Sequence, residues 1–386
     1  MCKHKAYKFR IHPSDEQKTF FAKSFGCVRL VHNLMLHDRI VAYETKKKTP
    51  GLRMKLPTPA QYKTDYPFLK EVDSLALANA QLHLDKAYKN FFQDKSFGFP
   101  KFKSKKNPVQ SYTTNNQKGT VRIMDGKYLK VPKLKSLIRI KLHRQIKGLI
   151  KSITLTKKPS GKYYVSILCE EEITEMPKTN ATIGIDLGIT DFAILSNGDK
   201  SDNNRFTAKM ANKLTREQRK LSRRTRLAKE KGIQLLDAKN VQKQKVTVAR
   251  LYEKVVNQRT DYLNKLSTDL IKKHDVICIE DLHTKGMMRN RKLARSIADV
   301  SWSAFVAKLQ YKADWYDKQL VKISRWYPSS QICSTCGHLD GKKALSIRTW
   351  TCSVCHTHHD RDVNAAKNIL AEGIRLLSTQ PQGLRG

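Results

Sequence analysis

The chain has 386 residues and a net charge of +41, from 75 Lys and Arg against 34 Asp and Glu. No segment approaches the 18 consecutive apolar residues of a membrane-spanning helix, and the N-terminus "MCKHKAYKFRIHPSDEQ" lacks the apolar stretch of a secretory signal. We therefore expect a cytoplasmic protein with two or three domains and no membrane partner. So large a positive charge implies a polyanionic partner, and nucleic acid is favoured over an acidic membrane surface.

The N-terminal half begins with a short strand and then becomes helical. Ser14, followed three residues later by Gln17, has the pattern of a capping box, and helices are predicted from there to the helix breakers at 49–51. A second helix is predicted over 65–93, before the basic, aromatic loop "FGFPKFKSKKNP". Four residues of that helix recur at helical spacing: Leu75, Asn79, Leu82 and Lys86.

The next region alternates β-forming residues with turn residues. Turns are predicted at Asp125–Gly126 and Ser160–Gly161, between runs that suit short strands. This pattern predicts a small β-barrel formed by residues 1–11 and 118–180. The helical residues 12–117 would then be an insertion after the first strand.

The C-terminal half mixes strands with long basic helices. Residues 181–200, "ATIGIDLGITDFAILSNGDK", predict β-hairpins with a turn at Asn197–Gly198, and residues 205–275 are predicted to form two helices divided at Gly232. The continuous apolar run in "DVICIED" suits a strand at the centre of a sheet. An amphipathic helix over 299–319, the strand "LVKISRWYP" and a final helix complete this half.

Four of the eight cysteines form two knuckles, "CSTCG" and "CSVCH". Their spacing, C-x2-C-x15-C-x2-C, brings four thiolates together and predicts one structural zinc. The predicted ligands are Cys333, Cys336, Cys352 and Cys355. The alternatives are an iron–sulfur cluster, four unrelated core cysteines, or substitution of a thiolate by one of the nearby histidines: His338, His356, His358 and His359.

Acidic residues stand at the ends of two predicted strands and at the start of the last helix. Asp186 closes "IGID", Glu280 and Asp281 close "VICIED", and Asp360 and Asp362 enter the final helix. The carboxyl ends of parallel strands are where α/β sheets place their sites. Three carboxylates gathered there would repel one another without a cation, which indicates Mg²⁺, and two such ions can promote phosphodiester cleavage.

The order of these motifs resembles a known family. The chain resembles TnpB, the family of transposon-encoded RNA-guided DNA endonucleases related to type V CRISPR effectors. Four motifs carry the resemblance: an Asp in a strand and hairpin, a Glu closing a later strand, the paired knuckles and "DRDVNAAKNIL". The segments "GCVRLVHN", "GFPKFKS", "SYTT" and "SGKYYVSILCE" extend the resemblance over essentially the whole chain.

The resemblance implies a multidomain α/β architecture. The barrel would be a wedge domain carrying a helical recognition domain, followed by an RNase H-like, RuvC-like nuclease at 181–325 and 359–378. A zinc ribbon at 326–358 would be inserted near the end of the nuclease, and 379–386 would form a flexible tail.

The resemblance also implies the activity and its partners. The catalytic triad would be Asp186, Glu280 and Asp362, holding two Mg²⁺. The partners would be a guide RNA from the transposon end and double-stranded target DNA beside a short transposon-associated motif. The ribonucleoprotein would contain one copy of the chain. It would be located in the cytoplasm of a bacterium or archaeon, associated with the nucleoid.

Basic residues in two segments are expected to contact nucleic-acid phosphates. They are Lys101, Lys103, Lys105, Lys106, Arg219, Arg223, Arg224 and Arg226. Phe99 and Phe102 could stack on bases. Two other functions stay open. One is a cut-and-paste transposase, in which a second Asp follows the later strand and a Glu lies on the last helix. The other is a nuclease-inactive, guide-directed DNA-binding regulator, which would have lost one of the three acids.

The two aspartates at the last helix are predicted to differ in role. If the helix includes Asp362, this residue shares an apolar face with Ala365, Ala366, Ile369 and Leu370. Packing of that face on the sheet would turn the Asp362 carboxylate toward the other two acids. Asp360 lies outside the stripe and is expected to cap the helix or to orient Arg361 or a metal-bound water, with the ribbon as a rigid brace.

Overall fold

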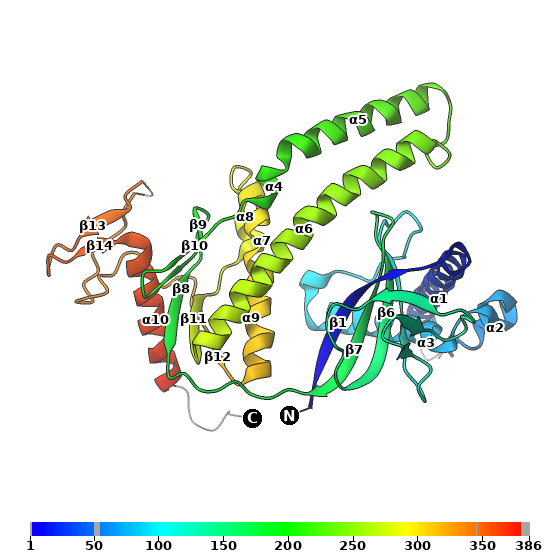
Figure 1. The fold of residues 1–386 in the computed structure, drawn as a ribbon, viewed down its shortest axis with the longest axis horizontal. Coiled ribbons are helices and arrows are strands. Elements are labelled where there is room, and N and C mark those ends of the chain that lie inside the picture. Colours follow the sequence, from blue (N-terminus) through cyan, green and yellow to red (C-terminus); the bar gives the residue numbers. More distant parts are fainter. Residues whose placement is uncertain (1, 50–54, 345, 380–386) are drawn as a thin grey trace. The chain divides into compact units, whose positions relative to one another are not determined.

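The computed structural model describes residues 2–49, 55–344 and 346–379 (Figure 1). The chain forms two compact units, Met1–Glu172 with Lys245–Ala249, and Ile173–Gln244 with Arg250–Gly386. Among the described residues, no helix is long and apolar enough to cross a membrane.

The first unit is built on a seven-stranded antiparallel sheet with the order β2-β6-β7-β1-β5-β4-β3. Its strands are β1 (Cys2–His12), β2 (Gln110–Asn115), β3 (Arg122–Met124), β4 (Tyr128–Lys130), β5 (Ile138–Lys141), β6 (Leu149–Lys157) and β7 (Tyr163–Glu172). The predicted turns at Asp125–Gly126 and Ser160–Gly161 join β3 to β4 and β6 to β7. Where we expected a small β-barrel, the described strands form one sheet that has β2 and β3 at the two ends of its strand order.

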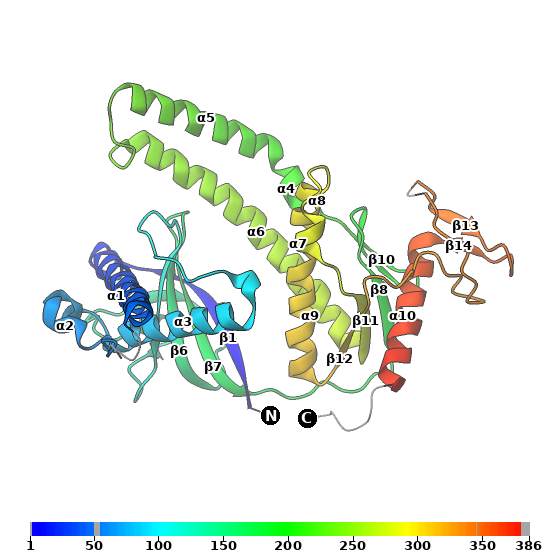
Figure 2. The same ribbon diagram turned by 180° about the vertical axis from the view of Figure 1, so that it is seen from behind.

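The helices of this unit cover one face of the sheet, with α1 and α3 side by side (Figure 2). They are α1 (Asp15–Lys48), α2 (Tyr62–Asp65), a 3-10 turn at Pro67–Glu71, α3 (Ser74–Gln93) and a 3-10 turn at Lys95–Phe97. The capping box at the start of α1 is confirmed, because Ser14 Oγ accepts from the Gln17 N–H at 3.3 Å and Gln17 Oε1 accepts from the Ser14 N–H at 3.0 Å. Phe21 of α1 packs against Tyr112 and Tyr163 of the sheet.

Two expectations for this region need correction. One long helix, α1, replaces the several helices predicted up to residue 49, and the breakers at Pro50 and Gly51 lie outside the described residues. The second predicted helix is interrupted around Pro67, since proline lacks the N–H that a continuing helix needs, and α3 begins only after the N-cap Asp73. Its buried face is Ala76, Leu77, Asn79, Ala80 and Leu84, and Leu82 of the predicted stripe is 55% exposed.

The helical insertion ends earlier than predicted. Residues 110–115, which we placed within it, form the edge strand β2. Alternating Tyr112 and Thr114 are buried against the sheet, so this segment follows a period of two rather than the helical period.

The second unit contains a five-stranded sheet with the order β10-β9-β8-β11-β12. Its strands are β8 (Thr182–Asp186), β9 (Asp191–Leu195), β10 (Lys200–Asp202), β11 (Val276–Glu280) and β12 (Gln319–Ile323). Strands β8, β11 and β12 are parallel, whereas β9 and β10 run antiparallel, joined by the predicted turn at Asn197–Gly198. The apolar strand β11 is at the interior of this sheet, as predicted.

Seven helices are described in this unit. They are α4 (Phe206–Lys209), α5 (Ala211–Glu230), α6 (Lys239–Lys273), α7 (Thr284–Met287), α8 (Ala294–Val300), α9 (Trp302–Tyr316) and α10 (Arg361–Thr379). Gly232, with φ of +67°, lies between α5 and α6 as predicted. The helix predicted over 299–319 stops at Tyr316, because Asp317 adopts a left-handed conformation and β12 begins two residues later.

The sheet is covered on both faces. On one face, four isoleucines of β8 and β11 pack in a core with residues of α6 and α9, such as Leu270 and Phe305. They are Ile183, Ile185, Ile277 and Ile279. On the other face α10 lies along β8 (Figure 1), and this close contact depends on Gly184: a Cβ there would be 2.1 Å from the Ala366 carbonyl oxygen. Two apolar layers therefore hold the carboxyl edge of the parallel strands in place.

Candidate active site and zinc ribbon

Two acidic residues end adjacent parallel strands. Asp186 is the last residue of β8 and Glu280 the last of β11, and the register pairs Ile185 with Ile279 just before them. The two carboxylates therefore leave the sheet side by side. Asp362 comes from the first turn of α10, the helix that packs on β8.

Two of the predicted catalytic acids act electrostatically on the third, Asp186. Burial, followed by the charges of Glu280 and Asp362, raises the pKa of Asp186 to about 7. Burial also raises the pKa of Glu280, against the effect of the Ser329 hydroxyl, which donates to Glu280 Oε1 at 2.7 Å. Since desolvation and like charges both disfavour ionised carboxylates, this site would be stabilised by a cation.

Asp360 has a structural role that differs from that of Asp362. Its Oδ1 accepts from the backbone N–H groups of Asp362 and Val363, both at 3.0 Å, so it is the N-cap of α10. Its Oδ2 pairs with Lys200 at 2.7 Å. The predicted cap is confirmed, but the predicted alternative partner Arg361 donates instead to carbonyl oxygens of the ribbon, including that of Ala344 at 2.8 Å.

The predicted zinc cysteines are brought together. The four Sγ atoms lie within 4.8 Å of one another, and among the described residues no other set of three or more His, Cys, Asp or Glu side chains is gathered in this way. The set comprises Cys333, Cys336, Cys352 and Cys355. Hydrogen bonds with the Thr357 hydroxyl and backbone N–H lower the pKa of Cys355 to about 6. Four convergent thiol groups are a donor set that suits structural zinc.

Of the four nearby histidines, His359 approaches the cluster. Its Nε2 lies 3.1 Å from Cys333 Sγ, and its ring packs on Trp350 with a centroid distance of 4.8 Å. This histidine belongs to β14 (His358–Asp360), which pairs with β13 (Thr349–Thr351). The ribbon hairpin thus continues to Asp360, two residues past the predicted boundary, and leads directly into α10.

Two buried asparagines of α10 fasten it to the chain entering the ribbon. Asn364 donates to the Ile332 carbonyl at 2.7 Å and accepts from the Ser334 N–H at 2.8 Å. Asn368, one turn later, donates to the carbonyls of Ser329 at 2.8 Å and Ile332 at 2.7 Å. The sequence interpretation missed both residues, although two Asn at i and i+4 beside the apolar stripe of a helix are a visible signal.

The basic loop of the first unit is fixed by an asparagine of α1. Asn33 Nδ2 donates to the Lys103 carbonyl at 2.9 Å, and Asn33 Oδ1 accepts from the Lys103 N–H at 2.8 Å. This contact joins the segments "GCVRLVHN" and "GFPKFKS". The predicted phosphate-binding residues Lys101, Lys103, Lys105 and Lys106 are exposed around it.

The predicted stacking residues and the arginines of α5 differ in their surroundings. Phe99 packs edge-on against Tyr88 and Phe91 and is 46% exposed, whereas Phe102 is 54% exposed. Arg219 and Arg223 are exposed on α5. Arg224 donates to Gln244 Oε1 on α6 at 3.0 Å, and Arg226 lies 3.5 Å from Glu230.

Three segments match family models. Residues 166–291 match the model described as "Probable transposase", and residues 302–369 match "Cas12f1-like, TNB domain". Residues 1–48 match "Helix-turn-helix domain", although here they form β1 and the single helix α1.

Two relatives match nearly the full length. A "Putative RNA-guided DNA endonuclease" of Streptomyces pristinaespiralis is 37% identical over 374 residues, covering 96% of this chain and 89% of that protein. The "Putative RNA-guided DNA endonuclease InsQ" of Escherichia coli K12 is 30% identical, covering 97% of this chain and 93% of that protein. The chain belongs to the TnpB/OrfB family of IS605-type elements. This TnpB-family chain also shares its fold with the protein in a Cas12f1–sgRNA–target DNA complex, with a TM-score of 0.55, 13% identity and coverage of 95% and 98%.

Proposed function

We propose that this chain is an RNA-guided DNA endonuclease that hydrolyses phosphodiester bonds of guide-matched DNA. The observation that carries the proposal is the half-buried Asp186 carboxylate, whose pKa is raised by burial and by Glu280 and Asp362. In a chain with a net charge of +41, a cluster of mutually repelling acids is most simply explained as a site for hard cations.

Asp186, Glu280 and Asp362 are the residues that would hold two Mg²⁺ ions. Bound there, the ions would supply an activated water and stabilise the leaving oxygen. The chain itself positions these acids: β8 and β11 fix two of them at one edge, and the capped start of α10 presents the third. The order β10-β9-β8-β11-β12 supports an RNase H-like, RuvC-like nuclease, with the seven-stranded sheet of the first unit as the wedge domain.

Guide dependence is proposed from the relatives that carry it in their names. The guide would come from the transposon end, and the target would be double-stranded DNA beside a short motif. The exposed lysines of the 98–109 loop and the arginines of α5 would contact phosphates of these nucleic acids, giving affinity without base choice.

Two other functions are less well supported. A nuclease-inactive regulator would lack an acid, whereas all three stand at their expected positions. A cut-and-paste transposase would carry a Glu on the last helix, whereas here Glu280 ends β11 and Asp362 is on α10.

The deciding experiment uses the ribonucleoprotein as purified. Sequencing of its RNA should give one discrete structured species, and the complex should cut matched DNA with Mg²⁺ but neither mismatched DNA nor matched DNA in EDTA. Random RNA together with cutting of any DNA would favour a non-guided nuclease. A discrete RNA with matched binding but no cutting would favour the regulator.

A further inference from the structure

A pocket of about 510 Å³ lies beside the turn that follows Asp186. Ile189 of the β8–β9 turn forms one wall, and Asn203 donates to the Ile189 carbonyl at 2.7 Å. This bond ties the segment entering α4 to the turn that leaves the catalytic strand. The pocket therefore borders the proposed nuclease site without including any of its three acids.

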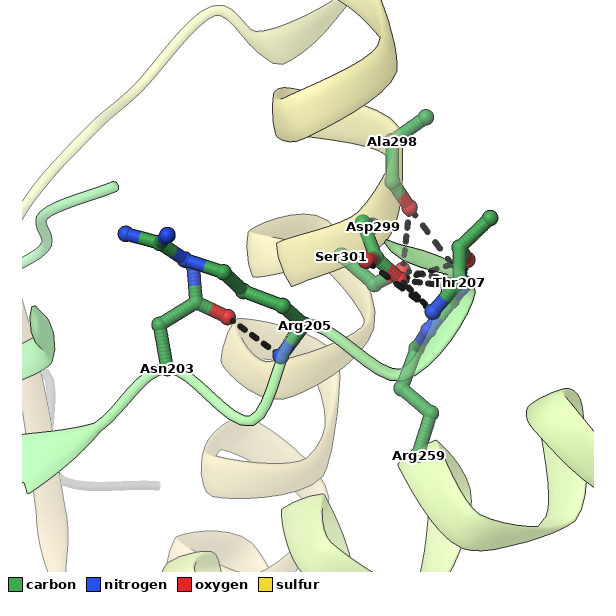
Figure 3. A network of polar contacts seen from close by, with 7 residues as sticks. All are labelled: Asn203, Arg205, Thr207, Arg259, Ala298, Asp299 and Ser301. Atoms are coloured by element: carbon green, nitrogen blue, oxygen red, sulfur yellow. Dashed lines mark hydrogen bonds and ion pairs between the residues drawn. The ribbon is translucent and has the colours of Figure 1, made fainter. Parts of the chain in front are cut away.

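The pocket has a positive character despite containing one carboxylate. Asp299 lines it, but its oxygens accept from the Thr207 N–H at 3.1 Å, the Thr207 hydroxyl at 2.6 Å and Arg259 Nη2 at 2.8 Å (Figure 3). Its charge is thus balanced by Arg259, which is outside the lining. Two further cations, Arg205 and Arg295, line the pocket, and Figure 3 shows the Arg205 side chain extending away from the Asp299 network.

The backbone around Arg205 is held in an uncommon conformation. Its φ of +44° is left-handed, a region that residues with a side chain rarely adopt. Asn203 Oδ1 accepts from the Arg205 N–H at 3.1 Å. Two residues after Arg205, the Thr207 N–H donates to Asp299. Because both sides of Arg205 are fixed, the fold determines the point at which its side chain leaves the backbone.

The rest of the lining combines the apolar Ile189, Ala208 and Ala211 with the polar Asn203 and Ser296. A guanidinium presents several N–H donors in a planar fork that matches phosphate oxygens. Apolar walls next to such donors suit a sugar attached to the phosphate. The chemistry of the pocket is therefore that of a nucleotide unit within a strand.

We propose that Arg205 and Arg295 bind one backbone phosphate of the DNA strand that is cut, with the adjoining sugar against Ile189 and Ala208. The inference rests on the proposed nuclease function. The strand being cut is favoured over the guide RNA because the pocket wall is the turn that continues from Asp186. A phosphate held here fixes the strand relative to the triad, so both arginines are positioning residues for the scissile bond.

The test combines charge removal on the protein with charge removal on the DNA. Arg205→Gln, Arg295→Gln and the double variant are compared with Lys265→Gln. Lys265 is an exposed cation of α6 in the same unit, paired with Asp261 at 2.8 Å, so this control removes one positive charge elsewhere. Each variant is made with and without Asp362→Ala, and its unfolding midpoint and RNA content are recorded.

Binding of single-stranded target DNA to the Asp362→Ala complexes reports on the pocket without requiring cutting. Each arginine variant should weaken binding about tenfold. The double variant should also flatten the slope of log affinity against log salt by about 0.7, the value for one phosphate of a single strand that is no longer neutralised. The Lys265→Gln control should change neither quantity. Unchanged affinity and slope in the double variant would overturn the proposal, even if the parent complex cuts no DNA.

Methylphosphonate scanning then locates the phosphate. A neutral linkage at one position should slow cutting by the parent complex, while the double arginine variant, already slow, should lose its sensitivity at that position alone. RNA content and unfolding midpoint should match the parent. The proposal is wrong if the double variant keeps the parent profile at every position, or if its loss of DNA binding follows a loss of bound RNA.

Discussion

The Ser329 hydroxyl donates a hydrogen bond of 2.7 Å to the Glu280 carboxylate, while Asn368 of α10 donates to the Ser329 carbonyl at 2.8 Å. One residue thus connects the end of β11 to the helix that carries Asp362. Ser329 also belongs to the segment that leads from β12 into the ribbon. The position of Glu280 relative to Asp362 therefore depends on this junction, which consists of the two hydrogen bonds of Ser329.

Ser329→Ala should impair cutting without removing any proposed metal ligand. Loss of the donor leaves the buried Glu280 less stabilised as an anion, so the Mg²⁺ concentration for half-maximal cutting should rise several-fold. Ser329→Thr keeps the hydroxyl and should restore most of the activity. The measurement is the Mg²⁺ dependence of the cutting rate, and an Ala variant with a parental curve would show that Ser329 does not act on Glu280.

Asn368→Ala tests the other half of the junction. Its amide donates to the carbonyls of Ser329 and Ile332. Asn364 still donates to the Ile332 carbonyl, so the variant removes this donor from the Ser329 carbonyl alone, and leaving a buried carbonyl without a donor costs about 1–3 kcal/mol. The free energy of unfolding should fall by that amount, and the rate of cutting should fall with it at saturating Mg²⁺. Lys367→Ala, an exposed change on the same helix, is the matched control and should alter neither measurement.

The purified chain should contain about one zinc. Cys333→Ser combined with Cys352→Ser removes one thiolate from each knuckle and should abolish retention of zinc, because two thiolates cannot complete the tetrahedral site. Cys2→Ser changes an exposed cysteine outside the cluster and should retain it. Elemental analysis decides, and zinc that persists in the double variant would mean that the metal is bound elsewhere.

The local motifs were predictable because their signals lie within a few residues. The capping box at Ser14, the turn at Asn197–Gly198 and the cysteine knuckles each depend on short spacings, and each is found where the sequence placed it. The cap formed by Asp360 was likewise expected, since Asp beside the first turn of a helix is a strong local preference.

Features set by tertiary packing were not predictable in the same way. The face that α3 buries is decided by its contacts with α1 and β2, so helical spacing predicts the helix but does not show which of its faces is buried. The Ser329–Glu280 and Lys200–Asp360 contacts join residues 49 and 160 positions apart, and no local pattern indicates such pairs. The assignment of Asp186, Glu280 and Asp362 as catalytic stays a prediction.

The basic loop held by Asn33 should contribute to nucleic-acid binding through charge. Replacing Lys101, Lys103, Lys105 and Lys106 with Gln should weaken binding and flatten its salt dependence, because fewer counterions are released. Asn33→Ala removes no charge: it should weaken binding by loosening the Lys103 backbone while keeping most of the slope. Affinity measured across a salt series distinguishes the two, and an unchanged slope in the lysine variant would exclude this role for the loop.

Lys312 of α9 should make stability depend on alkaline pH. Its buried Nζ donates to three neutral oxygens of α6, including Ser267 Oγ at 2.7 Å, and burial, followed by the nearby Lys308, lowers its pKa from 10.5 to about 8. A lowered pKa means that the charged form is disfavoured on folding. This cost is fully present below pH 8 and is relieved as the pH rises toward 10.5.

Lys312→Met should therefore raise the free energy of unfolding at pH 7 by about 2 kcal/mol. The gain should shrink between pH 8 and 10.5. The hydroxyl groups of α6 that lose Lys312 as a donor keep their own hydrogen bonds to helix carbonyls, as Ser267 does with Leu263 at 2.6 Å. Denaturant unfolding at several pH values checks this. A variant that is destabilised at pH 7 would show that the three hydrogen bonds outweigh the cost of burying the charge.

The two aspartates at the start of α10 should separate chemistry from capping. Asp362→Ala removes a carboxylate that acts on Asp186, so cutting of matched DNA should be abolished, as it should be in Asp186→Ala and Glu280→Ala, while DNA binding persists. Asp360→Ala removes the N-cap and the Lys200 pair, which costs about 1 kcal/mol and frays the first turn of α10. Since the Asp362 carboxylate is still present, reduced but measurable cutting should remain. Asp360→Asn keeps a capping oxygen and should recover more of the rate than Asp360→Ala, whereas Asp362→Asn should stay inactive. If Asp360→Asn were as inactive as Asp362→Asn, the charge on Asp360 would be needed in the reaction, and the assignment of the third catalytic acid would have to change.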